Sequence, residues 1–598
     1  MTAARAGSVF RENLLAEFSF LKSAASLLDA TARAVPVDGF NALLLPVCEL
    51  HATDDALVAL LARWRSDNQH AYPTRFTVTD EGTKSWLRRG VLDVPDRLLF
   101  LVLDRHGYPV GHLGFANCVN DRCVMEIDNV VRGSPTAPKG LMTAALETML
   151  AWAHRTLWPE SFALRVLEGN GHAVAFYRKR GFVECQRTPL RSEVHGDRTT
   201  LVPQNAADPQ PPVDVLLTMA RSVESPESRP GSELILTAGP SISAREIAYA
   251  TDAVRTGWNS QWGHYLEAFG RAFAGYVGVK HALPTSSCTG ALHIALAALG
   301  IGPGDEVIVP DITWVATANA VLYVGATPVF ADVQPSTWCL DPDAIGPLVT
   351  PRTRAVIPVH LYGHPAEMGR IMDVASAHGL RVVEDAAPSI GAEVQGRRTG
   401  SFGDFSAFSF QGAKLAVTGE GGMLLTNDDD LFERARVIWD QGRQPGTFWI
   451  RTNGLKYKMA NPLAAIGLGQ LQRNDALVEA KRRIYGWYRE GLADVPHLSL
   501  NGEAPWARSI CWMTSILLED SCPVARDEVI ASLKRLNVDT RPVFPAISQY
   551  PIWPRHQAPQ PVAKRIGDRG INLPSGVCLS RSQVDHVCRA VGRVLHAS

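Results

Sequence analysis

The chain has 598 residues, of which 46% are hydrophobic and 20% charged, and its formal net charge at pH 7 is −1. This length predicts more than one domain, and the composition predicts a globular protein with large buried cores. A net charge this close to zero excludes a general attraction to nucleic acid or to anionic membranes, so phosphate groups must be recognised locally.

The cysteines and the first residues indicate the compartment. Ten cysteines are spread along the chain without a C-x-x-C pair, which favours reduced thiols in a cytoplasmic protein, and we expect no metal site. The N-terminus contains no long apolar run, so we expect neither a signal peptide nor a membrane helix.

Apolar periodicity divides the first 222 residues into helices and strands. We expect helices at 12–34, 54–65, 140–157 and 172–180, and strands at 41–50, 98–103, 109–116, 123–131, 162–167 and 213–220. The order is therefore helices, an antiparallel meander, and then helix, strand, helix and strand.

Several polar residues of this region are placed where they suit chemistry. Glu126 and Asp128 lie on one face of a strand, because strand side chains alternate, although either is also compatible with a solvated strand residue. Asn170 and Tyr177 lie on one face of a helix, although Tyr177 is also compatible with a core aromatic. Gly140 opens a helix whose free N–H groups suit an anion, and simple capping would explain the same glycine.

This order of elements, with the segments EIDNVVRG, KGLM and LRVLEGN, resembles the GNAT acetyltransferases over residues 40–222. It is most similar to members that acetylate amino sugars on nucleotides. The resemblance implies a mixed, largely antiparallel sheet with helices, and acetyl-CoA as cosubstrate. In one position the chain departs from the family, because Met142 stands where the helix-opening loop usually has a second glycine.

The resemblance to GNAT enzymes implies a role for each of the polar residues. Gly140 would lie at the pyrophosphate of coenzyme A and Asn170 at its pantetheine end. Tyr177 would protonate the leaving thiolate. Glu126 is the candidate general base, directly or through water, with Asp128 as the next candidate.

A polar segment with two prolines, 222–231, separates the two halves of the chain. We therefore expect a first domain at 1–222, a linker at 223–232 and a second domain at 233–598.

The second domain shows the alternation of an α/β fold. We expect a helix at 243–255, alternating strands and helices from 281 to 426, a long helix at 461–490, and a smaller α+β lobe at 510–598. The alternation predicts a mainly parallel sheet with helices on both faces.

Within this domain, the apolar strand 405–410 leads directly to Lys414, which the glycine-rich turn 419–422 follows. A lysine is usually a solvated surface residue, but the strand before it and the glycines after it favour a lysine held in a cleft. A buried lysine loses its proton easily and then attacks carbonyl groups, which is Schiff-base chemistry.

Two further segments suit the same chemistry. The buried strand 380–385 ends in Asp385, whose carboxylate is costly to bury without a cationic partner. It is compatible with a helix cap or a surface acid, or with the acid that pairs with the pyridinium nitrogen of pyridoxal 5′-phosphate (PLP). Residues 285–290 place a cluster of hydroxyls before an apolar helix, which suits a phosphate, although ordinary N-capping needs one of them.

Residues 233–598 resemble the DegT/DnrJ/StrS-type sugar-nucleotide aminotransferases, a branch of the fold type I PLP enzymes. Segments in the family's order and spacing carry the resemblance, among them VVEDAAPSIGAE, FGDFSAFSFQGAKLAVTGEGG and GLKYKMANPLAAIG. The resemblance implies that PLP is bound covalently to Lys414 and that Asp385 holds its pyridine nitrogen. It also implies a ring stacked on Trp314, and phosphate contacts from Ser409, Thr289 and the backbone around Cys288.

Two positions depart from this family's pattern. Pro388 stands where many members have a glutamine near the cofactor's phenolic oxygen, and Lys456 where many have an asparagine that reaches the phosphate of the neighbouring subunit. A lysine can make that contact as a point charge, so we expect a homodimer with shared sites. Relatives with histidine in place of the active lysine are dehydratases, so Lys414 favours transamination.

The two resemblances together imply a bifunctional enzyme. The second domain would aminate a nucleotide-linked keto sugar with glutamate as donor. The first would then acetylate the new amine from acetyl-CoA. Fusion of the two domains would favour this second step by raising the effective concentration of the amino sugar at the first domain. The segments at 440–442 and 454–459 resemble those of enzymes acting on 4-keto-6-deoxy sugars, such as perosamine synthases. Two alternatives stay open: the first domain acetylates an unrelated amine, or it is a non-catalytic binding or assembly module.

Overall fold

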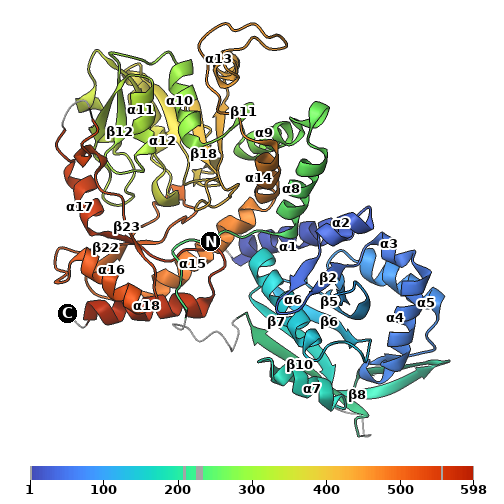
Figure 1. Cartoon of the computed structure of the whole chain (residues 1–598). Coiled ribbons are helices and arrows are strands. Elements are labelled where there is room, and N and C mark those ends of the chain that lie inside the picture. Colours follow the sequence, from blue (N-terminus) through green and yellow to red (C-terminus); the bar gives the residue numbers. More distant parts are fainter. Residues whose placement is uncertain (1–2, 206–210, 224–232, 554–556, 597–598) are drawn as a thin grey trace. The chain divides into compact units, whose positions relative to one another are not determined.

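The computed structural model describes residues 3–205, 211–223, 233–553 and 557–596. Contacts divide the chain into two units, residues 1–229 with 242–248 and residues 230–241 with 249–598 (Figure 1). The expected linker at 223–232 lies, apart from Val223, outside the described residues, so its boundaries stay a prediction.

The described residues of the first unit form a sheet of ten strands, in the order β1-β2-β4-β5-β6-β7-β10-β8-β9-β3. Only β6 and β7 are parallel neighbours, which confirms a mixed, largely antiparallel sheet. The strands are β1 (Val35–Val37), β2 (Ala42–Pro46), β3 (Thr74–Arg75), β4 (Leu98–Leu103), β5 (Pro109–Ala116), β6 (Val124–Arg132), β7 (Ser161–Leu167), β8 (Val183–His195), β9 (Arg198–Pro203) and β10 (Asp214–Ser222).

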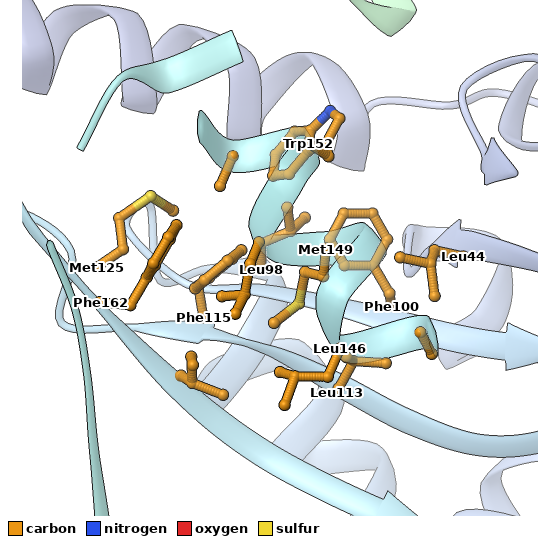
Figure 2. Close-up of a cluster of buried hydrophobic side chains, with 14 of the residues drawn as sticks. Leu44, Leu98, Phe100, Leu113, Phe115, Met125, Leu146, Met149, Trp152 and Phe162 are labelled. Carbon is orange, nitrogen blue, oxygen red and sulfur yellow. The ribbon is translucent and has the colours of Figure 1, made fainter. Parts of the chain in front are cut away.

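Helices cover both faces of this sheet, and its strands alternate between two cores. Phe100 of β4 contacts Trp152 on one face, with ring centroids 5.5 Å apart (Figure 2), whereas its neighbours Leu99 and Leu101 belong to a separate cluster with Trp64. The helices are α1 (Ala3–Lys22), α2 (Leu27–Ala32), α3 (Glu49–Ala52), α4 (Asp55–Asp67), α5 (Asp80–Ser85) with a π-helical turn (Trp86–Leu92), α6 (Leu141–Leu157) and α7 (Gly171–Arg178).

Two features of the first unit differ from the sequence prediction. The helix expected at 12–34 is two helices, α1 and α2. Ser26 is the N-cap that starts α2, because its hydroxyl accepts the Asp29 N–H at 3.1 Å. The hairpin of β8 and β9 was not predicted. Most side chains of β8 are exposed, so it lacks the alternation of apolar and polar residues that marks a half-buried strand.

The described residues of the second unit form a main sheet of seven strands in the order β11-β19-β18-β15-β14-β12-β13. The pairs from β18 to β13 are parallel, and only the pairs of β19 with β11 and β18 are antiparallel, so the expected mainly parallel sheet is confirmed. The strands are β11 (His281–Thr285), β12 (Glu306–Pro310), β13 (Thr327–Ala331), β14 (Thr353–Val356), β15 (Arg381–Asp385), β18 (Phe405–Ser409) and β19 (Gly422–Thr426).

Helices cover both faces of this sheet as well, as the side chains of β18 show. Phe405 and Ala407 belong to a core with α10, α11 and α13, whereas Phe408 belongs to a core with α9 and α14. The helices are α9 (His264–Val277), α10 (Cys288–Ala298), α11 (Ala316–Tyr323), α12 (Met368–Ala377), α13 (Asp429–Trp439), α14 (Asn461–Leu471) and α15 (Asn474–Gly491), and α8 (Ala244–Thr256) begins in the first unit and continues in the second from Tyr249.

The long helix expected at 461–490 is wrong in one respect, because α14 and α15 are separate helices. At the break, Gln470 and Arg473 direct their side chains to the Ser241 carbonyl, and the Gln470 Nε2 lies 2.9 Å from that oxygen. These two bonds fix the chain where α14 ends.

The expected α+β lobe is present and begins earlier than residue 510. It holds a sheet in the order β20-β22-β24-β23, and a short sheet β17-β16-β21 lies elsewhere in the unit. The elements are β20 (Leu498–Leu500), β22 (Ser515–Leu518), β23 (Arg541–Pro542), β24 (Gly570–Asn572), α16 (Arg526–Arg535), α17 (Pro561–Arg569) and α18 (Arg581–His596), and β16 (Glu393–Val394), β17 (Arg397–Arg398) and β21 (Ala507–Arg508) form the short sheet.

Within the described ranges, none of the helices combines the length and the apolar character that crossing a membrane requires.

Candidate active sites

Lys414 lies in a cavity of about 500 Å³ in the second unit. The buried strand β18 ends at Ser409, and a tight turn follows in which the Lys414 N–H donates to the Gln411 carbonyl at 2.8 Å. The Lys414 ammonium lies 4.1 Å from the ring centroid of Trp512, whose indole N–H in turn holds the Ala413 carbonyl at 2.9 Å. The loop that carries the lysine is therefore fixed against this tryptophan.

Asp385 ends β15 in the same cavity and is 5% exposed. Its Oδ2 accepts from the Thr317 hydroxyl at 2.7 Å, and its Oδ1 accepts from the Ala387 N–H at 3.2 Å. Burial raises the pKa of Asp385, an effect that Thr317, Ala387 and the positive charge of Lys414 oppose. Burial also lowers the pKa of Lys414, and Asp385 opposes this shift. The carboxylate is thus held in one orientation in a place where a cationic partner is favourable.

The N-terminus of α10 forms another wall of the cavity. The Ser287 hydroxyl caps it by accepting the Gly290 N–H at 3.0 Å, which leaves the N–H groups of Cys288 and Thr289 in the first turn without an acceptor in their own helix. A Cβ atom at Gly422 would lie 2.5 Å from the Cys288 nitrogen, so this glycine lets β19 approach the turn.

The residues present fit PLP. One cavity presents a buried carboxylate for a ring nitrogen, a lysine for a carbonyl carbon, and a helix N-terminus with the hydroxyls of Thr289 and Ser409 for a phosphate. Trp314 and Pro388 line the same cavity, and Trp314 is 60% exposed. All residues expected from the sequence to bind PLP, except Lys456, therefore line this cavity.

Lys456 lies outside this cavity, on an exposed segment. The neighbouring residue Tyr457 nevertheless touches the phosphate-side wall, because its carbonyl accepts the Ser286 N–H at 2.6 Å. An exposed lysine beside this turn is compatible with a contact to a second copy of the chain.

Thr317 and Trp512 were missed by sequence reasoning. Thr317 could have been suspected, because its segment TWVATANA belongs to the resemblance, but nothing local distinguishes it from an ordinary helix residue. Trp512 comes from a segment almost a hundred residues after the lysine, and no sequence pattern links the two.

In the first unit, β6 carries the acidic candidates Glu126 and Asp128. Its parallel pairing with β7 covers Val124 to Ile127 only, so Asp128 and Asn129 lie beyond the paired stretch. Asp128 accepts from Arg97 and lines a cavity of about 470 Å³. Glu126 is not among the residues that line it, and its two oxygens accept from Arg165 at 2.8 Å and Asn117 at 3.1 Å. Both oxygens of Glu126 are therefore already engaged, which counts against its expected role as the base.

The remaining acetyltransferase candidates lie on two helices. Tyr177 of α7 is buried against Phe182, and burial, together with the charges of Tyr72 and Asp128, raises its pKa. The phenol is thus within electrostatic reach of the end of β6. Asn170 caps α7 by accepting the Ala173 N–H at 3.3 Å, so its first role is structural.

Gly140 caps the seventeen-residue helix α6 with a φ of 90°, a conformation that glycine adopts without strain. Met142, which replaces the family's second glycine, packs toward Gly111, where a Cβ atom would lie 2.9 Å from its sulfur. The methionine therefore fills a space between α6 and β5, and the exposed turn at Gly140 remains open to a ligand.

A pH effect follows from His112, which lies beside Asp128 and Arg65 in the same cavity as Asp128. Burial lowers the pKa of His112 from 6.5 to about 4. The unfolded chain therefore binds a proton as pH falls through 6.5, whereas the folded chain does not, so the first unit should lose about 2 kcal/mol of stability between about pH 6.5 and pH 5. Thermal melts of the wild type and of His112→Asn test this, since the variant should lose less stability over the same range. An equal loss in both would contradict the assignment.

Two family models match the chain. The DegT/DnrJ/EryC1/StrS aminotransferase family matches residues 240–592, and an acetyltransferase (GNAT) domain matches residues 49–183.

Individual relatives and solved structures are similar over about three fifths of the chain. GDP-perosamine synthase of Caulobacter vibrioides is 43% identical over 370 residues, which are 60% of this chain and 98% of the relative. GDP-perosamine synthase of Escherichia coli O157:H7 is 38% identical and covers 59% of this chain and 96% of its own length. The structure of DesI with its TDP-sugar product is 33% identical, with a TM-score of 0.56 over 61% of this chain and 93% of that one.

Proposed function

The chain belongs to the DegT/DnrJ/EryC1/StrS aminotransferase family and has an N-terminal GNAT acetyltransferase domain, and on this basis we propose a bifunctional nucleotide-sugar enzyme. Its second unit transfers an amino group from glutamate to a nucleotide-linked 4-keto-6-deoxy sugar. Its first unit then acetylates the new amine from acetyl-CoA. The observation that carries the first activity is the meeting of Lys414, Asp385 and the N-terminus of α10 in one cavity.

Each residue of this cavity has a defined task in the proposed amino transfer. PLP, when bound, supplies a carbonyl carbon and an electron sink for the reacting carbon. Lys414 is the covalent attachment point, and its Nζ carries a proton between the donor or acceptor carbon and the cavity. The lowered pKa of Lys414 favours the neutral amine that both tasks need. Asp385, fixed by Thr317, holds a ring N–H, and the first turn of α10 holds the phosphate.

The curated relatives support a GDP-linked substrate, since two of them, at 43% and 38% identity, carry the name GDP-perosamine synthase. The test is mass spectrometry of the products formed from GDP-, UDP- and dTDP-linked 4-keto-6-deoxy sugars with glutamate. Amination of the GDP-linked sugar alone or fastest is the expected result. A protein that aminates none of the three would overturn the proposal.

Asp385→Ala should weaken PLP binding roughly 10- to 100-fold, because a hydrogen bond to a charged group is worth about 1.5–3 kcal/mol. Fluorescence titration of the apoprotein with PLP measures this directly, without turnover. Asp373→Ala, an exposed aspartate on α12, is the matched control and should bind PLP like the wild type. Unchanged affinity in Asp385→Ala would show that this carboxylate has only a structural role.

A second copy of the chain is part of the proposal, because Lys456 lies outside the cavity of its own chain. Lys414→Ala and Lys456→Ala subunits, each inactive alone, should recover activity when mixed and allowed to exchange. Random pairing puts half of the dimers in the mixed form, and one site in each mixed dimer is intact, so roughly a quarter of wild-type activity is expected. Shared sites would be contradicted if the mixture recovered no activity, or if ultracentrifugation showed a fully active monomer.

A further inference from the structure

The cavity at the end of β6 in the first unit is lined by residues that suit a larger ligand than a simple alkyl amine. Its volume of about 470 Å³ is in the range of small-molecule sites. Aromatic side chains, Tyr72, Phe76 and Trp86, form part of its wall, and three arginines, Arg65, Arg97 and Arg198, form another part. These two kinds of residue together suit a ligand with an aromatic base and phosphate groups.

The charges of the cavity are not balanced within the described residues. Arg97 is paired with Asp128, the single carboxylate of the lining. Arg65 instead donates to the Thr74 carbonyl at 2.9 Å and lies over the ring of Tyr72, 3.3 Å from its centroid. Arg198 extends from β9, and the pairing of β9 with β3 brings it to the cavity. Two positive charges are therefore left to attract an anion.

His112 also lines this cavity. Its Nδ1 lies 2.7 Å from the Asn129 carbonyl, and since a carbonyl only accepts, Nδ1 must carry the hydrogen. The ring is 4% exposed and its pKa is lowered to about 4, so it is neutral at physiological pH and Nε2 keeps a free lone pair. A neutral imidazole with a fixed tautomer is a proton acceptor.

We propose that this cavity is the acceptor site of the acetyltransferase unit. Arg65 and Arg198 bind the nucleoside diphosphate part of a nucleotide-linked amino sugar. His112 takes the proton of the reacting amine. The proposal rests on the acetyl transfer proposed above and names its acceptor. In the step itself, the amine nitrogen bonds to the thioester carbon of acetyl-CoA and the carbon–sulfur bond breaks. The amine proton passes to His112 Nε2 and from there to solvent. The thiolate takes a proton from Tyr177, whose phenolate regains one from solvent, so both side chains return to their starting forms.

Coenzyme A also contains a nucleoside diphosphate, so the test must separate the two sources. Hydrogen–deuterium exchange of the full-length, PLP-loaded protein is measured with GDP, UDP, dTDP or coenzyme A as the added probe. One of the three nucleoside diphosphates should slow exchange in residues 69–92 and in β9, and Arg198→Ala should weaken its affinity about tenfold through the loss of one charged contact. Arg191→Ala, an exposed arginine of β8 paired with Glu193, is the matched control and should bind as the wild type does.

Protection of these segments by coenzyme A in place of the nucleoside diphosphates would assign the cavity to the cosubstrate and overturn the proposal, as would protection by none of the probes. Hydrogen–deuterium exchange reports which segments are protected and needs no turnover. Nucleotide that binds to the second unit is therefore distinguished from nucleotide in this cavity. Protection by a nucleoside diphosphate without any acetylated product would keep the nucleotide site and overturn the acetyl-transfer step.

His112→Asn tests the proton acceptor, since the Asn side chain can still donate to the Asn129 carbonyl but has no basic nitrogen. Acetyl transfer should fall about 100-fold in kcat, within the range of general base catalysis, while protection by the nucleoside diphosphate persists. A full rate in His112→Asn combined with a lost rate in Glu126→Gln would give the role to Glu126 and overturn this assignment.

Discussion

Lys414→Ala should lower amino transfer by about 10⁴-fold or more while the second unit stays folded. The side chain is both the attachment point of the cofactor and the carrier of the proton, and general acid–base catalysis alone accounts for up to about 10⁴-fold. The side chain lines the cavity and its Nζ lies over the Trp512 ring, and it is not part of the hydrophobic cores of the sheet, so truncation should leave those cores intact. The measurement is the rate of glutamate-dependent amination of the keto sugar.

Two observations accompany the loss of rate. The visible absorbance of lysine-linked PLP should disappear from the purified variant, and the melting temperature should stay close to that of the apo wild type. Lys280→Ala, which removes an exposed lysine paired with Asp429, should keep both rate and absorbance. An amination rate in Lys414→Ala near that of the wild type would refute the assignment of the active lysine.

The parts of this site that the sequence predicted are those with a strong local signal. A buried strand that ends in or leads to a charged residue is visible in the sequence: β15 ends in Asp385, and β18 ends at Ser409, shortly before Lys414. The hydroxyl cluster before α10 is likewise a local capping signal. Strand periodicity also predicted β4 and β5 at their observed bounds.

The parts that were not predicted depend on contacts between distant segments. Thr317 meets Asp385 across 68 positions, and Trp512 holds the Ala413 carbonyl across 99, so neither contact leaves a periodic pattern. The acceptor cavity depends on the hairpin of β8 and β9, whose exposed side chains give no strand signal. Strand alternation places Glu126, the expected base, on the same face as Asp128. It says nothing of Arg165 and Asn117, which engage both oxygens of Glu126.

Tyr177→Phe should slow acetyl transfer by roughly 10- to 1,000-fold and leave amino transfer unchanged. A thiolate is released when the thioester breaks, and a positioned phenol that protonates it contributes at the scale of general acid catalysis. The raised pKa of Tyr177 keeps the phenol protonated and able to donate at neutral pH. Phenylalanine keeps the packing against Phe182, so the folded structure should persist.

The combined reaction shows whether the two units act in sequence. Wild-type protein supplied with the keto sugar, glutamate and acetyl-CoA should release an N-acetylated nucleotide sugar, identified by mass spectrometry. Free amino sugar should accumulate only without acetyl-CoA or in Tyr177→Phe, because that variant still aminates but acetylates slowly. If the wild type releases the unacetylated amino sugar despite saturating acetyl-CoA, its first unit acts on another amine or serves only as a binding module. Equal slowing of both reactions in Tyr177→Phe would instead point to a folding defect, which its melting temperature would reveal.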